Sequence, residues 1–463
     1  MTKKTSFLFP ILVVAAIVLS AQSNKMVIDM IGKAGKGTIA IPDFRGAAEA
    51  QQYMGTFNSV LWSEIEGSGL FNMAPKTMYP LQVPQTPQDF KPPQPQAAPV
   101  RRNAPAPAPT AKAPWLTDWS GPPVNATYLA FGYTAVKDNQ LVLFGWFYNV
   151  TQNDISNAQA IGKLYFGSID DKGARKIAQE FAADILKSVG ASSLAGTKIV
   201  FVSQRTGTKE IWTMDYDGSN QKQLTSYRSI STMPSVSPDG TKVAFTSFVR
   251  GTPEILLHSL ETGRRLPFYN QAASMNAQVD FTPDGKSVVF SSTAAGGYAQ
   301  IYRANINGSG LQRLTNVRKV EVEPKVNPKT GNEIVFVSGR SGPQQIFKMS
   351  IDGADIVQLT PGEGQASNPS WHPDGQHIAF AWTRGFEPGN FNIFIMDVAT
   401  REVVQLTHGA GRNENPTWAP DGKHIAFSSR HGSSTQIYSM LADGTDIKPL
   451  TTQGQNIMPV WSK

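Results

Sequence analysis

A repeated turn motif in the second half of the sequence constrains the fold most strongly. The motif Pro-Asp-Gly occurs in four copies, and a variant with the sequence VNPKTG stands at Val326–Gly331. The closing glycines of these turns lie 44 to 47 residues apart, at Gly240, Gly285, Gly331, Gly375 and Gly422. A regular repeat of this length is typical of four-stranded propeller blades.

Each repeat also carries the residues expected of half-buried strands. A short apolar strand follows every turn, as in Lys242–Thr246, and an aliphatic–aromatic pair such as Ile211-Trp212 marks the strand after it. Six such pairs, with Ile255-Leu256 as a variant, predict an all-β six-bladed propeller over residues 198–463. The first blade lacks its opening strand. We expect Met458–Trp461 to supply it and so to close the ring without an exposed sheet edge.

The region before the repeats predicts a small α/β domain over residues 37–190. We expect a helix within 46–67 and a second, amphipathic helix at 173–189, because apolar residues recur there at three- and four-residue spacing. Two long apolar segments, 127–136 and 140–150, predict a strand hairpin.

Residues 80–114 interrupt this domain with eleven prolines. Proline removes a backbone donor and fixes φ, so we expect this insertion to be an extended, unpacked linker. A docking site for a protein that recognises polyproline is the alternative.

The first residues predict an export signal. A basic start at Lys3-Lys4 precedes an apolar run from Phe7 to Leu19 that is short for a membrane span. Small residues follow at Ala21 and Ser23. We therefore expect a signal peptide at residues 1–23, cleaved after Ser23, and the alternative is an uncleaved anchor helix.

The sequence contains no recognisable catalytic or metal-binding motif. The chain has no cysteine, which excludes disulfides, thiolate metal sites and cysteine nucleophiles. The motifs G-x-S-x-G, H-E-x-x-H and the phosphate-binding loop do not occur in it. Of the six histidines, His377 and His424 occupy equivalent repeat positions. We predict a protein that is not an enzyme and uses no cofactor and no metal, with a histidine cluster across blades left open. The net charge of +7 is diffuse, so nucleic-acid binding is not expected.

Taken together, these features resemble the TolB family of the bacterial Tol–Pal system. The shared elements are the pattern P-x-W-x-P-D-G at Pro369–Gly375 and Pro416–Gly422, the closing segment Met458–Ser462, and the order of export signal, α/β domain and six blades. The resemblance implies a periplasmic scaffold, monomeric and not membrane-spanning after cleavage. Such a scaffold links inner-membrane TolA to the outer-membrane lipoprotein Pal. It supports outer-membrane integrity and invagination during cell division.

The resemblance also implies a TolA-binding strand at the mature N-terminus. Residues 24–36 stand at that place, and Met26, Val27, Ile28 and Asp29 within them are similar to the family's strand. An extended β-branched tail suits the addition of a strand to a partner's sheet. Packing of the tail on its own domain is the alternative.

The Pal-binding surface is implied to lie at the mouth of the propeller. Loops that enter the innermost strand of each blade would converge there and present a ring of polar groups. Glu323 resembles an acidic partner-contacting position of the family. The residues expected at this surface are Ser231, Thr232, Asn276, Gln278, Glu321, Glu323, Ser367, Asn368, Glu414, Asn415 and Asn456.

Three features depart from the family pattern: the insertion 80–114, the altered turn at Val326–Gly331, and Val279 where the repeat has proline. They leave other functions open. One is a TolB-like paralogue with another envelope partner. Another is a metal-dependent polysaccharide (oligogalacturonate) lyase, a similar propeller that would need several histidines at the channel mouth. A third is a peptidase-type propeller without its catalytic domain.

Overall fold

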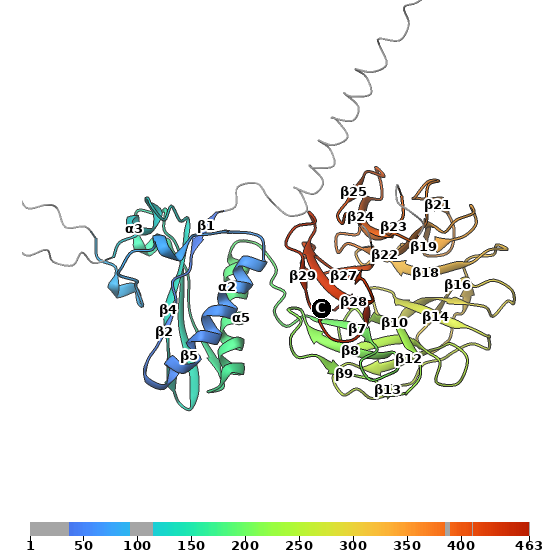
Figure 1. The fold of residues 1–463 in the computed structure, drawn as a ribbon, viewed down its shortest axis with the longest axis horizontal. Coiled ribbons are helices and arrows are strands. Elements are labelled where there is room, and N and C mark those ends of the chain that lie inside the picture. Colours follow the sequence, from blue (N-terminus) through green and yellow to red (C-terminus); the bar gives the residue numbers. More distant parts are fainter. Residues whose placement is uncertain (1–36, 93–113, 385–388, 410, 463) are drawn as a thin grey trace, which may run out of the picture. The chain divides into compact units, whose positions relative to one another are not determined.

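A computed structural model describes residues 37–92, 114–384, 389–409 and 411–462 (Figure 1). These residues form two compact units that divide between Ala195 and Gly196. The predicted signal peptide, the segment 24–36 and most of the proline-rich insertion lie outside the described residues. Within the described part of the chain, every helix is too short or too polar to cross a bilayer.

The first unit is built on a six-stranded mixed sheet. Its strands are β1 (Thr38–Ala40), β2 (Arg45–Gly46), β3 (Asn72–Met73), β4 (Tyr128–Lys137), β5 (Gln140–Asn149) and β6 (Gln159–Gly167). They lie in the order β3-β1-β4-β5-β6, and β2 pairs with β4. The predicted hairpin is β4–β5, and its turn residues Asp138 and Asn139 both have positive φ. Two such residues match the right-handed twist of the flanking strands.

Helices α2 (Met54–Gly67) and α5 (Asp171–Ser188) cover one face of this sheet, as Figure 1 shows. The 3₁₀ helix η1 (Ala48–Tyr53) leads into α2. The apolar faces of the two helices meet the sheet through fully buried side chains such as Phe57 and Phe181. Asp170 caps α5 by accepting a hydrogen bond from the Gly173 N–H at 2.7 Å. Both helices agree with the sequence prediction.

The segments that flank the proline-rich insertion cover the other face of the sheet. They contain the short helices η2 (Lys76–Met78), η3 (Pro87–Asp89) and α3 (Thr117–Ser120). The short helix α4 (Ile155–Ala158), which directly precedes β6, contributes to the same apolar cluster. Phe90 and Trp119 are buried in the same apolar cluster as Phe131. Pro114 is buried as well, and its carbonyl accepts the Lys91 N–H at 3.2 Å. The prediction of an unpacked linker is therefore wrong at both described ends of the insertion. Local hydrogen bonds order this part of the insertion: Asp89 accepts the N–H groups of Gln85 and Thr86 at 2.8 Å, and η3 directly precedes the buried Phe90.

The second unit is the predicted six-bladed propeller, and each blade is a four-stranded antiparallel sheet. The blades follow, each from its innermost strand outward. Blade 1 has β30 (Asn456–Trp461), β7 (Lys198–Ser203), β8 (Glu210–Asp215) and β9 (Lys222–Gln223); blade 2 has β10 (Ser231–Val236), β11 (Lys242–Ser247), β12 (Glu254–Ser259) and β13 (Arg265–Leu266); blade 3 has β14 (Asn276–Phe281), β15 (Ser287–Ser292), β16 (Gln300–Asn305) and β17 (Gln312–Arg313); blade 4 has β18 (Glu321–Val326), β19 (Glu333–Ser338), β20 (Gln345–Ser350) and β21 (Val357–Gln358); blade 5 has β22 (Ala366–Trp371), β23 (His377–Trp382), β24 (Asn392–Asp397) and β25 (Val403–Gln405); blade 6 has β26 (Arg412–Trp418), β27 (His424–His431), β28 (Ser434–Leu441) and β29 (Lys448–Pro449).

The predicted ring closure is confirmed. Strand β30 pairs antiparallel with β7, with Asn456 opposite Ser203 and Trp461 opposite Ile199. The buried Trp461 indole N–H donates to Thr197 Oγ1 at 3.0 Å, which ties the end of the chain to the start of blade 1. Trp371, at the equivalent repeat position, donates to the Lys325 carbonyl of the preceding blade at 3.0 Å. These tryptophans therefore lie between neighbouring blades.

Every innermost strand contains a bulge near its middle. The strand register shifts there, and one residue adopts a left-handed conformation with φ between 53° and 56°. An extra residue of this kind bends a strand and re-aims its side chain. The six bulge residues are Met233, Gln278, Glu323, Asn368, Asn415 and Met458.

Candidate protein-binding site

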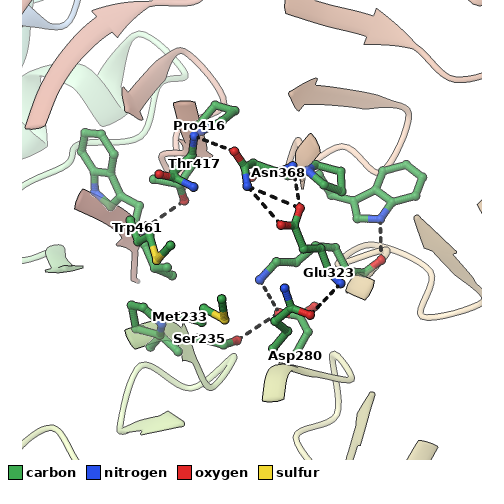
Figure 2. A pocket seen from close by; sticks show the side chains of 18 of the residues that line it. Met233, Ser235, Asp280, Glu323, Asn368, Pro416, Thr417 and Trp461 are labelled. Atoms are coloured by element: carbon green, nitrogen blue, oxygen red, sulfur yellow. Dashed lines mark hydrogen bonds and ion pairs between the residues drawn. The ribbon is translucent and has the colours of Figure 1, made fainter. Parts of the chain in front are cut away.

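The six bulges surround a cavity of about 300 Å³ at the axis of the propeller (Figure 2). The innermost strands of all six blades line it, and all six bulge residues belong to the lining. In five blades a proline follows the bulge residue, and Val279 takes this place in blade 3. A site lined by all six blades exists only in the closed ring.

Four neighbouring bulge residues form a hydrogen-bonded series that we call the polar arc: Gln278, Glu323, Asn368 and Asn415. In each step, one side chain accepts the backbone N–H of the next bulge residue. Gln278 Oε1 accepts from Glu323 at 3.3 Å, Glu323 Oε2 from Asn368 at 2.7 Å, and Asn368 Oδ1 from Asn415 at 3.3 Å. Figure 2 shows the Glu323–Asn368 step. These bonds fix the positions of the side chains before any ligand arrives.

The remaining two bulge residues, Met458 and Met233, lie in blades 1 and 2 and form what we call the methionine arc. Hydroxyls of the second strand accept the backbone N–H groups at both ends of this arc. Thr246 Oγ1 accepts from Gln278 N at 3.1 Å, in place of the Met233 side chain, and Ser428 Oγ accepts from Met458 N at 3.0 Å, in place of the Asn415 side chain. The cavity therefore has one polar side and one apolar, polarisable side.

Two carboxylates face the polar side of the cavity. Burial raises the pKa of Glu323, although hydrogen bonds from Asn368 and the charge of Lys325 act in the opposite direction. Asp280 accepts bonds from Ser235 Oγ at 3.0 Å and Lys325 Nζ at 3.3 Å, and from the Val326 N–H at 2.9 Å. Asp280 accepts hydrogen bonds from three residues, whereas those to Glu323 come from Asn368 alone. Glu323 is therefore the carboxylate best placed to accept a further hydrogen bond from a partner.

The predicted mouth residues lie within the innermost strands, and the expectation that they belong to entering loops is wrong. Of the predicted residues, only the four at bulges line the cavity: Gln278, Glu323, Asn368 and Asn415. The residues that begin or nearly begin a strand are buried instead, because they pair with the end of the second strand. These residues are Ser231, Thr232, Asn276, Glu321, Ser367 and Asn456, while Glu414 is half-buried beside the lining.

The cavity lining also contains Met233, Met458 and Asp280, which are not among the expected contact residues. A signal for the methionines exists, because Met233-Pro234 and Met458-Pro459 stand in the same repeat register as Glu323-Pro324. Polarity was the wrong criterion for choosing among the repeat positions.

Basic residues gather around the end of the propeller at which the innermost strands begin, which we call the rim. Arg250, Arg340 and Arg412 pair with Glu254, Glu321 and Glu414 there, at 3.3, 2.6 and 2.7 Å. Arg205 and Arg384 instead lie over the rings of Trp212 and Trp382, each 5.0 Å from the ring centre, with no ion pair among the described residues. Further rim residues are Arg228, Arg318, Lys319 and Arg430.

The opposite end of the propeller carries acidic turns. The aspartates of these turns are Asp217, Asp239, Asp284, Asp352, Asp374, Asp421 and Asp443. Lysines follow these aspartates in several turns, as Lys242, Lys286 and Lys423 do, so this end carries charges of both signs, whereas basic residues gather at the rim.

Comparison with known proteins agrees with this architecture. The family model of the TolB beta propeller domain matches residues 187–383 and 358–463. The chain belongs to the TolB family. The crystal structure of TolB from Acinetobacter baumannii has the same fold, with a TM-score of 0.70, 21% identity, and coverage of 92% of this chain and 97% of that one.

Two curated TolB relatives match shorter parts of the chain. The Protein TolB homolog of Chlorobaculum tepidum is 41% identical over 114 residues, 24% of this chain and 26% of the relative. The Tol-Pal system protein TolB of Roseobacter denitrificans is 31% identical over 244 residues, 51% of this chain and 48% of the relative. The chain thus matches between about a quarter and about half of the length of these relatives.

Proposed function

We propose that the chain is a periplasmic, non-catalytic scaffold of the Tol–Pal system. In this role it binds a Pal-like outer-membrane lipoprotein at the propeller and a TolA-like inner-membrane protein through its N-terminal segment. It thereby supports outer-membrane integrity and invagination during cell division. Membership of the TolB family and the name of the Roseobacter relative support this proposal.

The observation that carries the proposal is the ring of six bulge residues around the axis. A protein loop that enters the cavity meets a carboxylate and three amides on one side and two methionines on the other. The polar arc is held by its own hydrogen bonds, so little side-chain freedom is lost on binding. Such a preformed, two-sided cavity suits a partner that brings backbone N–H donors and one apolar side chain.

The rim adds charge to this recognition. Arg205 and Arg384 are stacked on aromatic rings, which orients each guanidinium group. Arg205 also donates to the Gln453 carbonyl at 2.9 Å and to Asn456 Oδ1 at 3.3 Å, and its remaining donors and those of Arg384 can bind a planar carboxylate. We therefore assign an acidic surface to the Pal-like partner. Charge complementarity of this kind mainly raises the association rate and selects the partner.

The TolA-like partner is assigned to the segment 24–36, which lies outside the described residues. In the sequence, Met26, Val27 and Ile28 are apolar and Asp29 follows them. In the proposed complex this segment adds a strand to the edge of a sheet of the partner, where main-chain hydrogen bonds supply affinity.

The lyase hypothesis requires histidines at the channel, and the described residues that line the cavity include no histidine. The acidic and amide groups of the polar arc already hold one another in hydrogen bonds. The geometry therefore favours a binding site over a catalytic one.

Photocrosslinking in cells tests the proposal. A crosslinking amino acid at Glu414, beside the polar arc, should capture a Pal-like lipoprotein. The same amino acid at Arg401, an exposed turn residue at the end of the propeller opposite the rim, should not. Removal of Met26–Asp29 should abolish capture of a TolA-like protein and leave the Glu414 product intact. Capture of no envelope protein from Glu414, or equal capture from both positions, contradicts the binding site; capture of a different envelope protein contradicts the Pal assignment.

A further inference from the structure

The turn between β22 and β23 differs chemically from the other repeat turns. In blade 2 the Ser237 hydroxyl donates to Asp239 Oδ1 at 2.5 Å and accepts the Lys242 N–H at 3.0 Å. Thr282 makes the same pair of bonds in blade 3, at 2.6 and 3.1 Å. A hydroxyl can donate and accept at once. In blade 5 His372 takes this position, and one imidazole nitrogen cannot do both.

The surroundings of His372 leave a conflict in the neutral ring. Nε2 lies 2.9 Å from the Gly422 carbonyl of the next blade, so it must carry the proton and donate. Nδ1 then has no proton and carries a lone pair. That lone pair suits the Asp374 N–H at 3.1 Å, but it also faces the Asp374 carboxylate oxygen Oδ1 at 2.9 Å. Two electron-rich atoms at this distance repel unless a cation lies beside them.

A second histidine completes the cluster. His377 Nδ1 lies 2.7 Å from Asp374 Oδ2, and the potential ligand atoms of His372, Asp374 and His377 all lie within 4.8 Å of one another. The other ring nitrogen of each histidine also faces a polar group. His372 Nε2 faces the Gly422 carbonyl, and His377 Nε2 lies 3.7 Å from Asp397 Oδ2. A metal-bound imidazole usually has such a partner on its other nitrogen, because the partner fixes the tautomer and the ring.

We propose that His372, Asp374 and His377 bind a divalent transition-metal ion, with Zn²⁺ as the reference ion. Two imidazoles and a carboxylate suit Zn²⁺, Ni²⁺ or Cu²⁺ better than Mg²⁺ or Ca²⁺. The Asp374 side chain is 32% exposed, so an ion can enter and water can complete its coordination. The site is independent of the cavity and of the proposed partners.

The ligands all belong to blade 5, but His372 also contacts blade 6. The His372 ring packs edge-on against Trp418 of blade 6, with ring centres 4.5 Å apart. A Cβ atom at Gly422 would lie 2.7 Å from His372 Nε2, so the close approach requires glycine. We expect bound metal to raise the thermal stability of the propeller by mass action, since the unfolded chain lacks the assembled site.

The equivalent turn of blade 6 has the same aspartate and second histidine but lacks the first histidine. Ala419 stands in the place of His372, while Asp421 and His424 keep the same Nδ1–Oδ2 contact at 2.7 Å. The aspartate–histidine pair alone is therefore part of the turn. The third ligand is what distinguishes the turn of blade 5.

Calorimetric titration of metal-free, full-length protein with ZnCl₂ tests the site. We expect one tight site in the wild type and a loss of affinity of about 100-fold or more in His372→Ser, beyond the 10–100-fold typical of outer-shell partners. Serine is the residue of blade 2, so the turn should form. His424→Ser should retain the site. Quenching of tryptophan fluorescence by Cu²⁺ should weaken in Trp418→Phe.

Three results would overturn the proposal. One is the absence of Zn²⁺ binding at micromolar concentration, and another is unchanged binding in His372→Ser. The third is a nuclear magnetic resonance signature of doubly protonated His372 at neutral pH without metal affinity, since a second proton also resolves the conflict. If His372→Ser does not fold, X-ray absorption of the wild-type zinc complex decides. Two nitrogen ligands plus oxygen support the site, and any other set contradicts it.

Discussion

Glu321 and Glu323 stand two residues apart in β18 and have opposite surroundings. The Glu321 side chain is fully buried, and it accepts bonds from Arg340 at 2.6 Å and Ser338 at 2.5 Å. Glu323 faces the cavity with amide donors from Asn368, and burial raises its pKa. The same residue type is therefore structural at one position and available to a partner at the other.

These surroundings predict stability effects of different size for two matched substitutions. Glu321→Gln leaves Arg340 without a countercharge and should lower the unfolding free energy by about 3 kcal/mol. Glu323→Gln keeps a hydrogen-bond acceptor for Asn368 and should change the unfolding free energy by less than about 1 kcal/mol at neutral pH. Urea unfolding of both full-length variants measures the difference, and equal losses would contradict the assignment.

The raised pKa of Glu323 gives a pH dependence with a definite sign. The folded protein holds this proton more tightly than the unfolded chain, in which glutamate titrates near pH ~4.3. The stabilising contribution of Glu323 is therefore complete below that pH and is lost as the pH rises through the raised pKa. Glu323→Gln should remove this component, so a wild-type and a variant curve of identical slope above pH ~4 would count against a raised pKa.

At the scale of elements, Tyr79 attaches the segment before the insertion to the sheet. Its hydroxyl accepts the Ile41 N–H at 3.0 Å and donates to the Ala74 carbonyl at 2.8 Å, and burial raises its pKa to about 12. The unfolded tyrosine ionises near pH ~10, so stability should fall as the pH rises from there through the folded pKa. Tyr79→Phe should be less stable at neutral pH and less sensitive to alkali. Urea midpoints at pH ~9 and ~11 measure both effects.

Strand β30 holds the first and last parts of the propeller together through Trp461. Trp461→Ala should cost about 3–5 kcal/mol because it leaves a cavity between blades. Trp461→Phe keeps most of the volume and should cost about 1 kcal/mol for the lost bond to Thr197. Urea unfolding orders the two variants, and a similar cost for both would mean that packing of the indole contributes little.

The elements that repetition predicts well are the strands. The aliphatic–aromatic pairs fall on the third strand of each blade, as Ile301-Tyr302 does on β16, because the same pattern recurs in six similar environments. The bulges were not predictable, since their left-handed residues include Met233 and Glu323, which have no intrinsic preference for that conformation. The left-handed conformation at these positions is imposed by the bulge that each innermost strand forms in the closed propeller. The packing of Phe90 was hidden by the proline-rich composition around it.

For the whole molecule, the gathering of arginines at the rim predicts how a partner approaches. Association of the Pal-like partner should slow as salt concentration rises, because the rim arginines attract an acidic surface over a distance that ions screen. Arg384→Glu should slow association by about tenfold at low salt. Arg401→Glu makes the same charge change at the other end and should not. Stopped-flow mixing at low and high salt measures both, and equal effects would contradict the role of the rim.

Part of this charge distribution is readable from the sequence. Every Pro-Asp-Gly turn places an aspartate at the same end of the ring, and in three of the four turns a lysine follows within three residues. The basic end does not follow so directly, because Arg205 and Arg384 share a repeat position that holds Ala294 in blade 3. Only the assembled ring shows that these loops surround one opening.

The pairing of β30 with β7 also determines when the propeller can close during synthesis. During synthesis, β7 emerges long before β30, so its open edge must wait until almost the entire propeller has been made. A ribosome that stops early releases a chain with five complete sheets and one unfinished sheet. Such a product should be a preferred target for proteases and chaperones, and quality control of this protein would then depend on its final few residues.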